Sequence, residues 1–156
     1  MSDSTIIDVA DAIVAMLTAA ALPITPATIE RRYVPAFDLS ELKDLMIAVA
    51  PMAIDPRAPL DRQRDSLDCV VAVSLMQKLT DVADPDDLDD LVAMALATAK
   101  ALAAGKLPAA MDAKLIQMKH DPIIDVPFIK HNRTFFSIIT TTWRVSEVVR
   151  VTQAAS

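Results

Sequence analysis

The stretch LDCVVAVSLMQKL at residues 67–79 decides the fold, because apolar side chains occupy both of its alternating faces. An alternation with a period of two predicts a strand. One face carries Leu67, Cys69, Val71, Val73 and Leu75. The other face is only partly polar, so we expect a central strand that is covered on both sides by helices or by a neighbouring subunit.

Three other segments have strand character. TIERRYV at 28–34 alternates, and LMIAVAP at 45–51 is a short apolar run that Pro51 is expected to end. The last segment, 134–151, is rich in β-branched and aromatic residues, which favour strands. Between the second strand and the central one, the proline- and charge-rich segment 51–66 predicts an extended hairpin arm or loop.

Two segments predict helices. Residues 4–21 carry apolar side chains at helical spacing, and residues 80–106 carry a similar stripe. Asp84 stands at the expected N-cap of the second helix, followed by Pro85 in its first turn. Gly105, the only glycine of the chain, is expected to end this helix in the left-handed conformation.

The order of these elements is α, β, β, β, α, β. It predicts an α+β fold with a mainly antiparallel sheet of about four strands and two main helices packed on one face. A length of 156 residues suits a single domain, 1–156. Residues 106–133, which contain both histidines, are expected to be irregular, and 152–156 to be a frayed tail.

Composition excludes several classes of protein. An average chain of this length has about 11 glycines, whereas this one has a single glycine. It therefore has no Walker A loop, no dinucleotide-binding GxGxxG and no GxSxG nucleophile elbow. Cys69 is the only cysteine and lies in an apolar run, so it is expected to be a small buried hydrophobe.

Charge divides the chain into two parts. The formal net charge is −6, with 17 acids and 8 bases in residues 1–105 and 4 acids and 7 bases in residues 106–156. The overall acidity argues against a general nucleic-acid binder. The division is either chance clustering on a solvated surface or a pair of opposite-signed faces that meet in a ring.

No combination of residues indicates catalysis or metal binding. The acids at 81–90 do not fit a calcium loop, because positions six and twelve counted from Asp84 hold Asp89 and Ala95. His120 and His131 show no zinc-ligand spacing, and no serine has a recognisable nucleophile context. We therefore expect no metal, no cofactor and no enzymatic activity.

Charged residues of the hairpin segment are the candidate functional residues. The arginines are either exposed charges on strand edges or part of a subunit interface, where arginine is enriched. The predicted interface set is Arg57, Asp61, Arg62, Arg64, Asp65 and, on the last strand, Arg144.

The succession of segments resembles the tail terminator or tail completion proteins of tailed bacteriophages. RRYVPAFDLSELKDLMIAVAP at 31–51 leads into the arginine-bearing IDPRAPLDRQRDS at 54–66, and DCVVAVSLMQKL follows at 68–79. An acid-opened helix begins at Pro85, and RTFFSIITTTWRV at 133–145 matches a final F-x-S-x-x-T-x-x-x-R-V strand.

This resemblance implies a hexameric ring that caps the tail tube, stops its polymerisation and joins the tail to the head-side connector. The implied partners are further copies of the chain, the tail tube protein and the connector, with DNA only passing through the lumen. The implied location is the virion, assembled in the cytoplasm of the bacterial host. The N-terminus opens with acids and predicts neither a signal peptide nor a membrane span. Two alternatives stay open: another head-completion or neck protein, and a small ligand-binding or enzymatic domain that uses residues 106–133.

Overall fold

The computed structural model describes most of the chain. The described residues are 5–26, 28–33, 44–61, 64–79, 85–108 and 112–148. The side chains of 55–61, 64–66, 85 and 146–148 lie outside this description.

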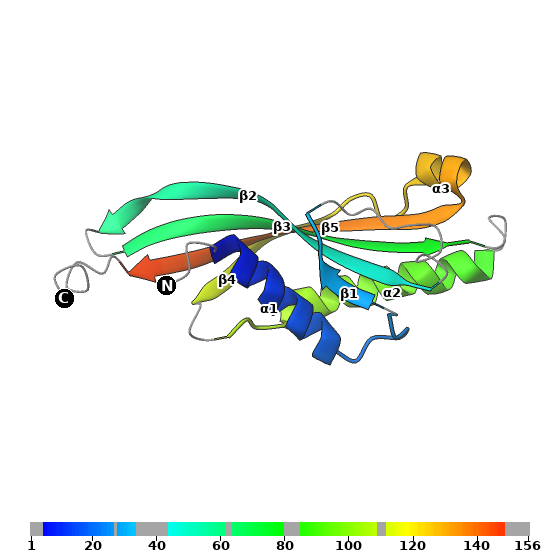
Figure 1. The fold of residues 1–156 in the computed structure, drawn as a ribbon, viewed down its shortest axis with the longest axis horizontal. Helices are drawn as coiled ribbons and strands as arrows, with labels where there is room; N and C mark the ends of the chain where they lie inside the picture. The colour runs from blue at the N-terminus through cyan, green and yellow to red at the C-terminus, as the bar shows by residue number, and fades with distance from the viewer. Residues whose placement is uncertain are drawn as a thin grey trace.

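Within the described residues, five strands form one sheet in the order β1-β2-β3-β5-β4 (Figure 1). The strands are β1 Thr28–Arg31, β2 Met46–Asp61, β3 Arg64–Lys78, β4 Ala113–His120 and β5 Thr134–Val148. β1 pairs with β2 in parallel, and the other three pairs are antiparallel. The prediction of an α+β fold with a mainly antiparallel sheet is confirmed, and the stretch that decides it is the central strand β3.

Helices α1 (Thr5–Ala19) and α2 (Pro85–Ala104) lie together on one face of this sheet (Figure 1). Both share one hydrophobic core with the inward-facing residues of β2, β3 and β5. The largest fully buried side chains of this core include Trp143, Phe135, Ile13, Leu17, Ile47 and Leu75. The predicted N-cap of α2, Asp84, lies outside the described residues.

The opposite face of the central strands is buried as well. Met46, Ala48 and Met76 form a second, smaller apolar cluster, against which Phe136 packs. Ser74 on the same face of β3 is 1% exposed. Both faces of the central strand are therefore buried, whereas cover of the second face by a helix or a neighbouring subunit stays a prediction.

The prediction that Pro51 ends a strand is wrong, because β2 continues through it to Asp61. Its register with β3 shifts between Pro51 and Ala53, and β1 pairs with β2 only as far as Val49. A proline is tolerated at a bulge and where no neighbouring strand needs its N–H. The predicted hairpin arm is confirmed as the β2–β3 hairpin, whose last register pair is Asp61 with Arg64.

The prediction of a left-handed cap at Gly105 is also wrong, because no described glycine has a positive φ. Its N–H donates to the carbonyl of Ala101 at 2.8 Å, which closes the last turn of α2. A Cβ at this position would lie 2.0 Å from Sδ of Met16 on α1 and 2.8 Å from the Ala101 carbonyl oxygen. Glycine is therefore needed here for the close approach of the two helices.

The prediction that residues 106–133 are irregular is wrong, because this segment contains β4 and a third helix, α3 (Val126–Asn132). The carboxylate of Asp125 caps α3 by accepting a hydrogen bond from the N–H of Phe128 at 3.0 Å, and Pro127 lies in the first turn. α3 lies at one end of β5 rather than with α1 and α2, and its Phe128 ring is 4.9 Å from that of Phe136. Among the described residues, the sheet therefore has five strands where about four were expected, and α3 adds to the two main helices.

Candidate functional site

The predicted interface residues lie mostly at the end of the β2–β3 hairpin. Arg57 is in register with Ser66, and Arg64 with both Asp61 and Val148. Arg62 lies outside the described residues. At the other four hairpin positions only the backbone is described, and these are Arg57, Asp61, Arg64 and Asp65. The backbone thus places the four described positions on neighbouring strands, and the role of all five in an interface stays a prediction.

Arg144, the sixth predicted residue, forms an ion pair across two strands. Its Nε donates to Oδ1 of Asp68 at 3.0 Å, and its second guanidinium nitrogen donates to Oδ2 at 3.3 Å. Asp68 is 6% exposed, whereas the Arg144 side chain is 36% exposed. The hydrogen bonds to Asp68 raise the pKa of Arg144 above its ordinary value. Arg144 therefore holds a buried carboxylate and still presents a cation at the surface.

Arg144 belongs to a polar strip on the face of the sheet that turns away from α1 and α2. Residues directly opposite each other on antiparallel strands project on the same side. Here the alternation of β5 buries Thr141 and Trp143 and leaves their neighbours on the outer side. The register pairs are Lys114 with Arg144, Gln117 with Thr142 and Lys119 with Thr140. We call these six residues the basic strip, because three of them are cations and none is an acid.

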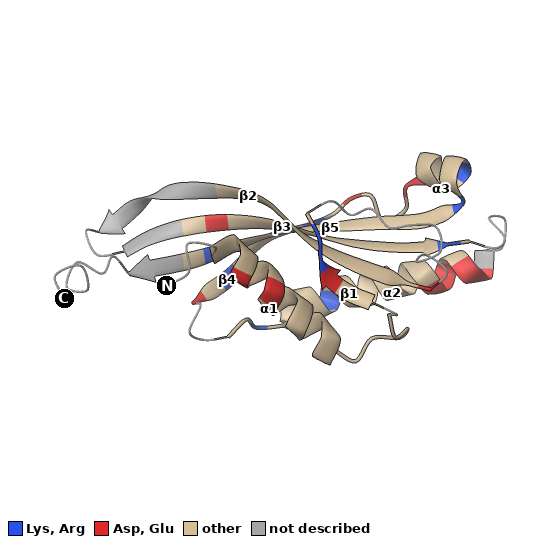
Figure 2. Ribbon diagram, in the orientation of Figure 1, with Lys and Arg blue, Asp and Glu red and all other residues tan. Residues whose placement is uncertain are grey.

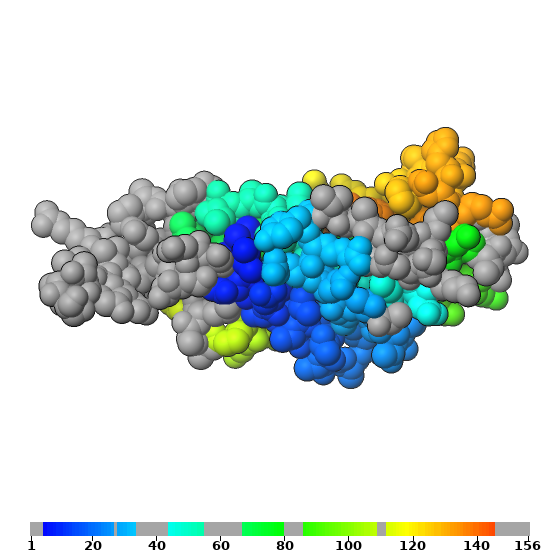
Figure 3. All heavy atoms as spheres, in the orientation of Figure 1, coloured from blue at the N-terminus to red at the C-terminus, as the bar shows by residue number. Residues whose placement is uncertain are grey.

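A second surface feature is an apolar cluster beside the start of α1. Tyr33, Met52 and Ile54 are 64%, 61% and 45% exposed, and they line a shallow hollow together with Ile6 and Ile7. Figure 3 shows the N-terminal part of the chain and the adjoining part of β2 together on one face. Exposed apolar clusters of this kind favour contact with another protein.

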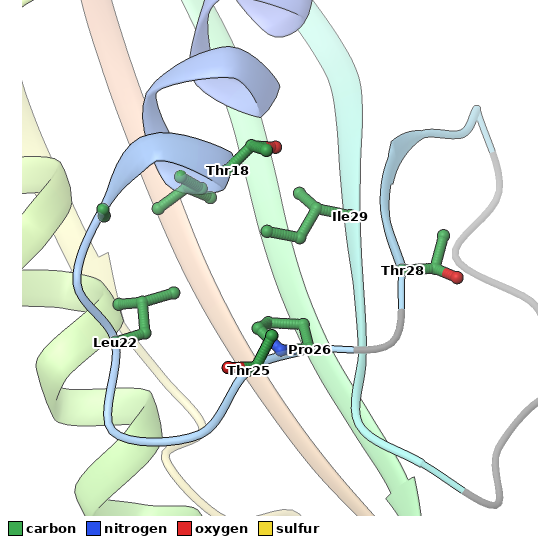
Figure 4. A pocket seen from close by; sticks show the side chains of 8 residues that line it. Thr18, Leu22, Thr25, Pro26, Thr28 and Ile29 are labelled. Carbon is green, nitrogen blue, oxygen red and sulfur yellow. The ribbon is translucent and has the colours of Figure 1, made fainter.

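A larger hollow of about 390 Å³ lies between the end of α1 and β1 (Figure 4). Its walls are Leu17, Leu22, Pro26 and Ile29 with several threonines, and none of the described residues that line it is charged. The hydroxyl of Thr18 donates to the carbonyl of Val14, so it is engaged within the helix. The hollow thus combines apolar side chains with threonine hydroxyls.

The two histidines lie in different surroundings. Nε2 of His120 is 2.8 Å from the hydroxyl of Ser137, and burial lowers the pKa of His120. Ser137 is fully buried, so this hydroxyl is closed to a substrate. The contact links the end of β4 to β5, and His131 is exposed on α3. The sequence did not indicate this contact, because β4 itself was not predicted.

Within the described part of the chain, no three His, Cys, Asp or Glu side chains gather closely enough to hold a metal ion. Of the helices described, none has the length and apolar character needed to cross a membrane. Cys69 is buried on β3, as predicted.

No protein-family model and no curated protein matches the sequence. The structure is similar to a chain of the solved virion of a native gene transfer agent particle, with a TM-score of 0.52 and 14% sequence identity. The similarity covers 95% of this chain and 100% of that chain. At this identity it shows that the two chains share a fold.

Proposed function

We propose that this chain is a structural protein of a phage-like virion and that it acts as a tail terminator. In this role it forms a ring, expected to be a hexamer, that caps the tail tube, stops its polymerisation and joins the tail to the head-side connector. The role is architectural and needs neither cofactor nor turnover. Assembly takes place in the bacterial host cytoplasm.

The observation that carries this proposal is the similarity to a chain of the gene transfer agent virion. It extends over 95% of this chain and the whole of the other, so it is not confined to one common motif. The gene transfer agent chain belongs to a virion particle. We propose that the present chain is likewise a component of such a particle.

The assignment to the tail terminator type rests on the order of segments. Two elements of the chain resemble those of the family in sequence and order. They are the arginine-bearing β2–β3 hairpin and the final strand, which carries Ser137 and Arg144. The exposed cluster of Tyr33, Met52 and Ile54 supports contact with another protein. A net charge of −6 would weaken adhesion of DNA phosphates to the wall of a ring through which DNA passes.

Light scattering coupled to size exclusion, followed by negative-stain microscopy, tests the proposal. We expect a ring with a mass of about six times 16.9 kDa, formed alone or on tail tube protein. Added during polymerisation of the tube protein, the chain should shorten the tubes and sit at their ends. A strict monomer that leaves tube length unchanged would contradict the proposal. Co-purification with filled heads instead of tubes would assign the chain to the neck.

A further inference from the structure

We propose that the basic strip on β4 and β5 binds the start of α2 from a second copy of this chain. The start of α2 carries four exposed carboxylates, which we call the acidic turns: Asp86, Asp87, Asp89 and Asp90. Figure 2 shows them gathered at one end of the helix. This inference rests on the proposed function, because it names a contact that would close the proposed ring.

The charges of the two surfaces are complementary. β4 contains Lys114 and Lys119 and no acid, and Arg144 lies next to them on β5. The first eight residues of α2, 85–92, contain four acids and no base. Complementary potentials of this kind steer two surfaces together and fix their register.

The side chains of the strip can reach a partner. The Lys119 side chain is 69% exposed, and its one ion pair, with Asp121, is long at 3.8 Å between two exposed groups. Gln117, Thr140 and Thr142 provide donors and acceptors between the cations. Such a surface can accept carboxylates without first breaking a strong internal contact.

The two surfaces lie on different sides of the molecule, so the contact must join two copies. The strip faces away from α2, because Arg144 alternates along β5 with Trp143 and Val145, which are buried in the core that α2 shares. One copy therefore cannot bring its own two surfaces together. Repeated head-to-tail contacts generate a ring when the rotation closes.

Nucleic acid fits the strip less well than a second copy does. The strip has only three cations, and one of them, Arg144, also pairs with Asp68, so it offers too few charges for a row of phosphates. The chain as a whole is acidic, and no aromatic side chain on the strip offers a stacking surface for bases. The strip is therefore better suited to a few carboxylates than to a polyanion.

Two charge-reversed variants test the proposal: K114E/K119E on the strip and D89K/D90K on the acidic turns. Each variant alone brings like charges together, so we expect the concentration needed for half-assembly to rise about tenfold or more. An equimolar mixture should assemble again, because every contact in an alternating ring then joins opposite charges. Assembly is measured by light scattering at about 0.1 M salt, where surface charges are only partly screened, and circular dichroism verifies folding.

Lys100→Glu and Asp44→Lys are matched controls at exposed positions outside the two surfaces, and both should assemble like the wild type. If both reversed variants assemble at the wild-type concentration, or if the mixture fails to recover, the proposed contact is wrong while the ring itself stands. A wild type that stays monomeric, with and without tube protein, contradicts the proposed function instead. If K114E/K119E assembles normally but loses binding to duplex DNA in fluorescence anisotropy, the strip is a nucleic-acid surface and the proposal fails.

Discussion

Arg144 on β5 and Asp68 on β3 are register partners whose side chains form two hydrogen bonds, at 3.0 and 3.3 Å, on the outer face of the sheet. The carboxylate is buried and the guanidinium is partly exposed. Removing the cation would take two charge-assisted hydrogen bonds from a buried carboxylate, which costs more than removing both charges.

The first prediction follows from this asymmetry. Arg144→Leu should lower the urea midpoint of unfolding more than the double variant Asp68→Val/Arg144→Leu, although the double variant changes more atoms. Urea titrations of the wild type and the two variants measure the order of their unfolding midpoints. A double variant less stable than Arg144→Leu would mean that the pair contributes net stability beyond the cost of burying Asp68.

A second prediction concerns Thr141, whose hydroxyl donates to the carbonyl of Val71 at 2.8 Å and accepts from Nε1 of Trp143 at 2.9 Å. Thr141→Val keeps the shape and removes both hydrogen bonds, so the Trp143 N–H stays buried without an acceptor. We expect a loss of about 2 kcal/mol in the free energy of unfolding. Thr141→Ser keeps the hydroxyl and should lose only about 1 kcal/mol, for the missing methyl group. Equal losses would argue against the role of the hydroxyl.

Gly105 provides a third prediction. Gly105→Ala should reduce the free energy of unfolding by about 1–3 kcal/mol through overpacking against Met16 and the Ala101 carbonyl. Met16→Ala in the same chain should recover only part of the loss, because the flexible thioether can be removed while the carbonyl stays. A thermodynamic cycle of the two single variants and the double variant measures this coupling. Full additivity would show that the two residues do not meet.

The fourth prediction is a pH dependence at His120. Burial lowers its pKa in the folded chain, so the unfolded chain, with a histidine pKa of about 6.5, binds more protons. The contribution of neutral His120 to stability is therefore complete above about pH 6.5 and is lost as the pH falls through the folded value. The difference in unfolding free energy between wild type and His120→Gln should shrink between about pH 7.5 and 5.5. His131→Gln, at an exposed position, is the control, and a constant difference would contradict the prediction.

The fifth prediction concerns the hairpin. If Arg64 lies in the subunit contact, Arg64→Glu should weaken ring formation about tenfold, because the substitution replaces an attraction with a repulsion. Lys100→Glu makes the same change in charge on the exposed side of α2. Light scattering across a concentration series compares the two variants. An unchanged oligomer mass for Arg64→Glu would remove the hairpin arginine from the predicted interface.

The central strands and the two long helices were predictable from the sequence, because their apolar side chains repeat with the periods of the structures they form. The alternation that ends at Leu75 and the stripe that includes Leu91 and Leu102 both point into the core. The last strand was equally clear from its β-branched residues around Trp143. These patterns involve residues that are close in sequence, and the elements they predict are present in the fold.

Residues 106–133 escaped prediction for a physical reason. β4 lies at the edge of the sheet and exposes Lys114, Ile116 and Lys119, so its side chains do not alternate between apolar and polar. α3 has only seven residues, too few for a helical repeat to stand out. The sequence signal was the capping pair Asp125 and Pro127. The basic strip could not be found either, because it depends on pairing between β4 and β5.

The length of β2 has a consequence for solubility. Beyond Val49 this strand continues without β1 beside it and carries Pro51, Pro56 and Pro59. An open strand edge can recruit other chains into fibrils, and each proline removes an N–H that such growth requires. The prolines that were expected to end the strand would therefore oppose amyloid-like stacking, and their replacement by alanine is expected to increase aggregation.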